Sequence, residues 1–282
     1  MDDELWTLER IERERAELAP LARLHRALAE ETLAFATDGS GPAARPAFAG
    51  PPALHWLAGR TLLAAARRDV LRGLVAPLTR RLALRVGAEF PPVAGPAAEI
   101  ADAAARDDFP WDELLDDPAA ELSHGALPHA PLLRFLFLRA LAAPAAHLAR
   151  AFSGPGPGRW TRPACPWCGL PPAAAVAQAG ADRLLLCVLC GGRWTRPGMA
   201  CPQCDEDRAD RLRVLAGRDA GPAALEACDT CGTAVKVFHD GALEPGPPLA
   251  LELLTLRLDV VAERDEGVRR AGAALAALFP PD

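Results

Sequence analysis

The chain contains no tyrosine, few methionines and lysines, and no cysteine outside four closely spaced pairs. It also lacks any long run of charge of one sign, and its formal net charge is −6 over 282 residues. Proteins that bind nucleic acid need clustered basic side chains, because contacts with phosphate supply most of their affinity. The composition therefore argues against a general nucleic-acid binder, and we expect no nucleic acid among its partners.

The N-terminus, MDDELWTLER, opens on acidic residues and lacks the basic-then-apolar pattern of a signal peptide. A membrane-spanning helix needs roughly 20 apolar residues with few charges. The most apolar stretch carries Arg134, Arg139 and Arg150, so we expect a buried helix there and no stable membrane insertion. The chain is expected to be soluble and cytoplasmic, where paired cysteines are metal ligands or redox groups rather than structural disulfides.

The first half of the chain predicts a helical bundle, because apolar residues recur at helical spacing and no period-2 alternation is present. Pro20 predicts a break or kink in the first helical segment, and a Gly/Pro-rich connector follows that segment. One or two helices are expected over 54–86. The other expected helices span 5–35, 96–108, 109–117 and 130–152.

All eight cysteines lie in CxxC pairs, whose two intervening residues let both sulfurs turn toward one point. Glycine after the second cysteine permits a left-handed turn, and it stands there in three pairs, whereas Asp205 stands in the fourth. Two such knuckles complete a tetrahedral four-sulfur site suited to zinc or iron. The predicted ligands are Cys165, Cys168, Cys187 and Cys190 at one metal, and Cys201, Cys204, Cys228 and Cys231 at the other.

The spacers between the pairs support this grouping, since knuckle, hairpin, knuckle and strand occur in that order twice. This is the layout of a zinc ribbon or rubredoxin-like unit. Interleaved pairing of alternate knuckles stays open as the alternative. The expected strands span 173–178, 183–187, 192–196, 211–216, 224–228 and 233–238.

Each ribbon has fewer than forty residues, and units of that size usually need a metal or disulfides to fold. A structural zinc contributes about 10–16 kcal/mol of apparent binding free energy in small peptides. Four thiolates around a divalent ion leave each site at a charge of about −2, which Arg183, Arg193 and Arg196 are expected to offset in part near the first site.

The predicted fold class is α+β, with an N-terminal α-helical bundle followed by two small rubredoxin-like or zinc-ribbon β units and a C-terminal helix. The predicted domains are a helical domain over 1–158, a first four-cysteine ribbon over 159–198, a second over 199–240, and a C-terminal helical segment over 241–282.

Three interpretations of the cysteines are open. Both metals are structural, or at least one site is functional through iron redox change or metal-dependent docking, or the pairs perform dithiol chemistry. The third is disfavoured, because a thioredoxin-like pair needs a helix N-terminus within an α/β fold. Trp160, Trp167 and Trp194 are expected to shield the sulfurs, with an exposed aromatic patch as the alternative. No phosphate loop, nucleotide fingerprint or nucleophile motif is present.

Residues 160–272 resemble the formate dehydrogenase accessory proteins of the FdhE type. The matching pieces occur in one order: CPWCGLPP, RLLLCVLCGGRW, CPQC, EACDTCGTAVKVF and LRLDVVAERDEGVRRAG. In the fourth piece, Glu226 precedes the knuckle and Lys236 follows it. Val268 and Ala234 depart from the family's pattern, and they leave the metal sites intact.

This resemblance implies a cytoplasmic maturation protein, not an enzyme in its own right, with a helical N-terminal region and a rubredoxin-like C-terminal region. The resemblance favours iron, whereas four-thiolate sites in general favour zinc, so two metal ions, iron or zinc, each in a four-cysteine site, are expected. The resemblance also implies the formate dehydrogenase catalytic subunit as partner. The alternative is a zinc-ribbon nucleic-acid-binding protein, for which Arg193, Trp194 and Arg196 are the best candidate contacts.

Overall fold

The computed structural model describes residues 2–37, 48–116, 118, 129–155, 160–177, 182–198, 200–216, 223–239, 248–265 and 267–270. The connector after the first helical segment, the two turns inside the ribbon hairpins and the end of the predicted C-terminal helix lie wholly or largely outside these residues. Two compact units are present: the first lies within 1–49 and 63–147, and the second within 50–62 and 148–273. The four predicted domain ranges stay a prediction.

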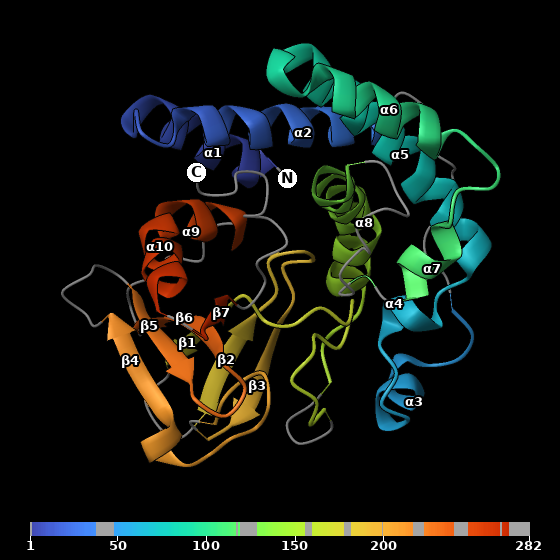
Figure 1. Ribbon diagram of the computed structural model, residues 1–282. Coiled ribbons are helices and arrows are strands. Elements are labelled where there is room, and N and C mark those ends of the chain that lie inside the picture. Colours follow the sequence, from blue (N-terminus) through green and yellow to red (C-terminus); the bar gives the residue numbers. More distant parts are fainter. Residues whose placement is uncertain are drawn as a thin grey trace. The chain divides into compact units, whose positions relative to one another are not determined.

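The first unit begins with a helical hairpin of α1 (Asp2–Glu14) and α2 (Ala19–Thr37), separated by a turn (Figure 1). Pro20 lies in the first turn of α2, where a proline is tolerated because that N–H has no partner within the helix. The predicted break is therefore confirmed. Glu12 accepts hydrogen bonds from Arg23 and Arg26, each 3.1 Å long, and these ion pairs join the two helices.

The remaining helices of the first unit pack around a core of leucine, isoleucine and aromatic side chains. They are α5 (Arg68–Glu89), α6 (Ala94–Ala104), α7 (Trp111–Asp116) and the first part of α8 (Ala130–Ala151), with short α4 (Leu62–Ala65) and a 3-10 turn at Pro91–Val93. The largest fully buried side chains here include Leu71, Leu78, Leu82, Ile100, Trp111, Phe135 and Phe137.

The prediction of one or two helices over 54–86 is wrong, because three are present: α3 (Pro52–Leu57), α4 and α5. Gly59 follows α3 with a φ of +67°. A left-handed residue at this position ends a helix, and glycine adopts that conformation without steric cost. Helical spacing alone did not reveal this stop.

Among the described helices, α8 alone is long and apolar enough to span a membrane by length and composition. Of its most apolar 18-residue window, 61% is buried inside the protein. Burial of this extent is typical of a core helix, as the sequence predicts.

The second unit contains a sheet of strand order β3-β2-β1-β6-β5-β4 (Figure 1). Each ribbon forms its own antiparallel three-stranded part, and the two parts join where β1 and β6 pair in parallel. The strands are β1 (Ala174–Ala177), β2 (Asp182–Leu186), β3 (Arg193–Pro197), β4 (Leu212–Ala216), β5 (Ala223–Cys228) and β6 (Thr233–His239).

The C-terminal segment covers one face of this sheet. It forms α9 (Pro248–Leu254) and α10 (Leu256–Arg264), which are separated at Thr255, and then β7 (Arg269–Arg270), which pairs with β6. Leu251, Leu258 and Ala262 pack there against apolar side chains of β1, β2, β5 and β6. The predicted α+β class with two ribbon units is confirmed, whereas the described part of the predicted C-terminal helix, 248–265 and 267–270, forms two helices and a short strand.

Candidate metal centres

Each CxxC pair forms a tight knuckle closed by one backbone hydrogen bond. The N–H of the residue after the second cysteine donates to the carbonyl of the first cysteine, at 2.8 to 3.0 Å in all four pairs. That residue has a positive φ in every case: +86° at Gly169, +70° at Gly191, +64° at Asp205 and +68° at Gly232. The left-handed turn expected from the glycines is therefore present, and Asp205 adopts it as well.

The eight sulfurs gather in two groups of four, and none forms a disulfide. Within each group the four Sγ atoms all lie within 4.8 Å of one another. These are the two sets that the spacers predict, and interleaved pairing does not occur. The groups are Cys165, Cys168, Cys187 and Cys190, here called site 1, and Cys201, Cys204, Cys228 and Cys231, here called site 2.

The sulfur separations fit a metal centre. In site 1, Sγ of Cys165 lies 3.5 Å from that of Cys190, and Sγ of Cys168 lies 3.4 Å from that of Cys187. The two corresponding separations in site 2 are both 3.7 Å. A zinc ion with bonds of about 2.3 Å to four thiolates places the sulfurs about 3.8 Å apart, whereas a disulfide needs about 2.05 Å. Four thiols in this geometry suit zinc or iron equally, and metal binding by these residues stays a prediction.

Burial of the four thiols in site 1 opposes their ionisation unless a cation is bound. It raises the pKa of the Cys165 and Cys168 thiols well above the ordinary value. Hydrogen bonds from the three neighbouring thiols instead lower the pKa of Cys187. Four thiolates cannot share this space without a positive charge, so a metal ion would bind as the thiol protons leave.

Site 1 is enclosed on several sides. Cys165 and Cys187 are fully buried, and Cys168 and Cys190 are 3% and 4% exposed. The three tryptophans of the first ribbon are also buried, as expected for side chains that shield the sulfurs rather than form an exposed patch. These tryptophans are Trp160, Trp167 and Trp194.

A segment far away in sequence adds to this enclosure. Trp56 Nε1 donates a hydrogen bond of 3.0 Å to the carbonyl oxygen of Pro166, inside the first knuckle. The Leu62 N–H donates to the same oxygen at 3.2 Å, and the ring of Trp56 meets that of Trp167 edge to face at 6.5 Å. Residues 50–62 therefore cover the first knuckle, which the sequence pattern did not predict.

Gly192 is a tightly packed position beside site 1. A Cβ there would lie 2.5 Å from the Trp167 ring and 3.1 Å from Cys190 Sγ. Gly192→Ala is expected to destabilise the protein by about 1–3 kcal/mol, because the buried ring must move. Thermal unfolding of the metal-loaded protein measures this.

Gly73→Ala is the matched control, since nothing lies within 4 Å of its added Cβ inside α5. That change is expected to stabilise by up to about 1 kcal/mol through helix propensity. An equal melting temperature for the two variants would show that the ring does not press on Gly192.

Site 2 is more open. Cys201 and Cys228 are buried, Cys231 is half-buried, and Cys204 is exposed. Arg196 forms an ion pair with Asp205 and donates a hydrogen bond of 2.6 Å to the carbonyl of Thr161. Arg196 of the first ribbon thereby contacts Asp205, the residue that closes the Cys201–Cys204 knuckle in the second ribbon.

The expected role of Arg183 near site 1 is corrected by its contacts. Arg183 is 3% exposed and pairs with Glu226 of β5 at 2.7 Å, so its charge is matched by a carboxylate of the second ribbon. Lys236, the single lysine of the chain, is also 3% exposed. Its Nζ lies 2.9 Å from Glu252 of α9 and 2.9 Å from Asp259 of α10. These ion pairs, whose cations are buried, join the ribbons and hold the C-terminal helices, and sequence reasoning missed them.

Two of the three residues expected to contact nucleic acid in the alternative function are not available for such contacts. Trp194 is 4% exposed, so its ring cannot stack on a base. Arg196 is already bonded to Asp205 and to the Thr161 carbonyl. Of the three candidates, Arg193 alone is exposed.

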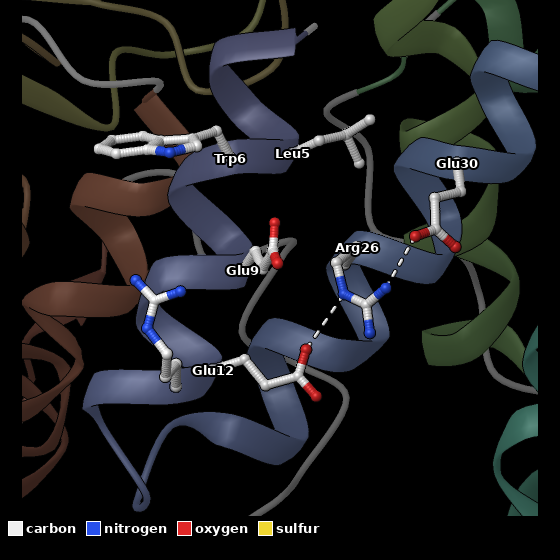
Figure 2. A pocket seen from close by; sticks show the side chains of 7 residues that line it. Leu5, Trp6, Glu9, Glu12, Arg26 and Glu30 are labelled. Carbon is white, nitrogen blue, oxygen red and sulfur yellow. Dashed lines mark hydrogen bonds and ion pairs between the residues drawn. The ribbon is translucent and has the colours of Figure 1, made fainter.

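A second candidate site is a hollow of about 640 Å³ between α1 and α2, lined by Leu5, Trp6, Glu9, Glu12, Arg13, Arg26 and Glu30. Figure 2 shows Arg26 between Glu12 and Glu30 and bonded to both. Trp6 is 60% exposed, and the Arg10 guanidinium lies over its ring at 5.2 Å. Because Arg26 is already bonded to both Glu12 and Glu30, the hollow is a weaker candidate than the cysteine groups.

No protein-family model matches the chain. Curated relatives do match: the FdhE homolog of Pseudomonas aeruginosa is 32% identical over 121 residues, which are 39% of this chain and 38% of that protein. The FdhE homolog of Cronobacter sakazakii and the FdhE protein of Escherichia coli O127:H6 are each 31% identical over 110 residues, 38% of this chain and 35% of theirs. The match thus spans less than half the length of these relatives.

The crystal structure of the Pseudomonas aeruginosa FdhE protein aligns with 97% of this chain and 94% of its own, with a TM-score of 0.59 and 22% identity. At that identity the comparison shows a shared fold. The resemblance to the FdhE family is therefore confirmed, in sequence by curated relatives over part of the chain and in fold over nearly all of it.

Proposed function

We propose that this chain is a cytoplasmic accessory protein for the maturation of formate dehydrogenase. It would bind two metal ions through its eight cysteines and bind the immature catalytic subunit of that enzyme, without a reaction of its own. The observation that carries the proposal is the pair of four-sulfur sites within flanks of the FdhE type. The relatives named FdhE in sequence and in fold support it.

The construction of the second unit supports a binding role rather than catalysis. Four thiolates fill all positions of a tetrahedral centre, and a catalytic zinc site instead keeps one position for water or substrate. The metal then supplies folding free energy to ribbons that have little core of their own. The two ribbons, joined by β1 and β6, would present a single metal-stabilised sheet to a partner.

A deletion strain tests the proposal. Formate dehydrogenase activity is expected to be lost without this protein and restored by the wild-type chain and by Arg208→Met, which removes an exposed ion pair with Asp210. Cys187→Ser is expected to restore little activity, and the wild-type chain should co-purify with the catalytic subunit. Normal activity in the deletion strain, together with no association, would exclude the proposed role.

A further inference from the structure

The two four-cysteine groups differ most in their access to solvent. Every thiol of site 1 is buried, whereas site 2 has one exposed and one half-buried thiol. Cys204 is exposed together with the residue that follows it, Asp205. The sulfur separations of 3.7 Å in site 2 are nevertheless those of a complete four-sulfur centre.

The surroundings of the sites explain this difference. Site 1 is covered by Trp167, and the first knuckle is held by hydrogen bonds from Trp56 and Leu62. No tryptophan lies in the chain after Trp194, so the second ribbon has no equivalent cover of its own.

The two knuckles that form site 2 differ in how far the rest of the protein covers them. They are the third knuckle, with Cys201 and Cys204, and the fourth knuckle, with Cys228 and Cys231. The fourth knuckle lies against the backbone of the segment after α10, since a Cβ on Gly232 would lie 2.6 Å from the Gly267 carbonyl oxygen. The third knuckle, with Cys204, is the open side. The three residues after Cys204 are acidic, and the first of them, Asp205, is paired with Arg196.

Exchange of a thiolate-bound ion requires an entering ligand to reach the ion. At a buried site this needs local opening of the protein, which is rare when packing and hydrogen bonds hold the site closed. At an open site the entering ligand replaces one exposed sulfur while the fold stays intact. Cys204 is the sulfur that can be replaced in this way.

We propose that site 2 is an exchangeable metal site, through which a thiophilic divalent ion such as zinc or ferrous iron enters and leaves by way of Cys204, and that site 1 keeps its ion permanently. This rests on the metal-binding part of the proposed function. It gives the two centres different tasks: site 1 keeps the ribbons folded, and site 2 accepts or donates an ion to thiolate or imidazole ligands of another molecule.

The test uses the full chain loaded with two equivalents of zinc and an excess of the coloured chelator 4-(2-pyridylazo)resorcinol under native conditions. One equivalent is expected to leave at least about tenfold faster than the other. The fast phase should persist in Cys168→Ser, which alters site 1, and be absent in Cys204→Ser. Release of both ions at one rate, or a fast phase that is lost in Cys168→Ser and kept in Cys204→Ser, would overturn the proposal.

A second measurement needs no variant. Brief treatment of the zinc-loaded wild-type chain with iodoacetamide, followed by peptide mass spectrometry, is expected to modify Cys204 before any thiol of site 1. First modification at site 1 would overturn the proposal. A chain that binds no zinc would instead refute the metal-binding part of the proposed function, so the two failures are distinguishable.

Discussion

Replacing Cys187 with serine is expected to remove one metal ion per chain and to unfold the first ribbon, while the helices of the first unit stay folded. Cys187 is fully buried, and its Sγ lies 3.4 Å from that of Cys168. A structural zinc contributes about 10–16 kcal/mol of apparent binding free energy in small peptides at neutral pH, and a ribbon of fewer than 40 residues has little core of its own to replace it. This is the largest effect that a single substitution should have in this chain.

Elemental analysis of the purified variant gives the metal content, and hydrogen exchange shows which segments open. Exchange is expected to rise in β2 and β3, with α5 and α6 still protected. Cys228→Ser is the matched comparison, because the same change in site 2 should also leave one ion and should open β4 and β5 instead. Two equivalents of metal in Cys187→Ser would refute the grouping of the sulfurs.

The second large effect is expected at Lys236. Its side chain rises from β6 between Ala174 and Leu225 of the neighbouring strands, on the face that α9 and α10 cover. Lys236→Met would leave the carboxylates of Glu252 and Asp259 without this partner. Breaking a buried pair by removing one member costs about 3–5 kcal/mol, so the free energy of unfolding should fall by that amount, and hydrogen exchange should rise in α9 and α10.

Two further variants isolate the cause. Arg208→Met removes an ion pair whose side chains are 60% and 64% exposed, so its effect should stay within about 1 kcal/mol. The triple change Lys236→Met, Glu252→Gln and Asp259→Asn removes all three charges and should recover part of the lost stability. If chemical denaturation gave the same loss for Lys236→Met and Arg208→Met, the buried charges would not hold the C-terminal helices.

Local patterns were enough to predict the strands of both ribbons. Strands β1 to β6 lie within one or two residues of the expected ranges, because each is bounded by a knuckle or a turn whose residues are distinctive. The grouping of the sulfurs follows for the same reason, since a hairpin returns its second knuckle to the first.

Contacts between distant segments were not predictable in this way. The parallel pairing of β1 with β6 joins two ribbons that each look complete alone, and nothing in the spacing indicates it. The cover of the first knuckle by residues 50–62 has the same origin, because Trp56 and Pro166 are 110 residues apart. Helical periodicity specifies which face of a helix is apolar, and it does not specify what that face meets.

The charged residues of β5 and β6 show most clearly which contacts the sequence does not predict. The sequence places Glu226 and Lys236 beside the fourth knuckle and indicates no partner for either. In the structure they lie on adjacent strands, and both form ion pairs with residues outside the second ribbon. Glu226 pairs with Arg183 of the first ribbon, and Lys236 pairs with residues of α9 and α10. A charged residue in an apolar strand signals that a partner is required, and the partner itself comes from the fold.

The central claim is that the eight cysteines hold two metal ions in separate four-sulfur sites. Native mass spectrometry of the chain purified without oxygen, with elemental analysis of the same sample, tests it most directly. Two equivalents of iron or zinc per chain and no disulfide are expected. A folded chain whose mass shows no bound metal, with an ordered sheet and eight reactive thiols, would contradict metal binding by these cysteines.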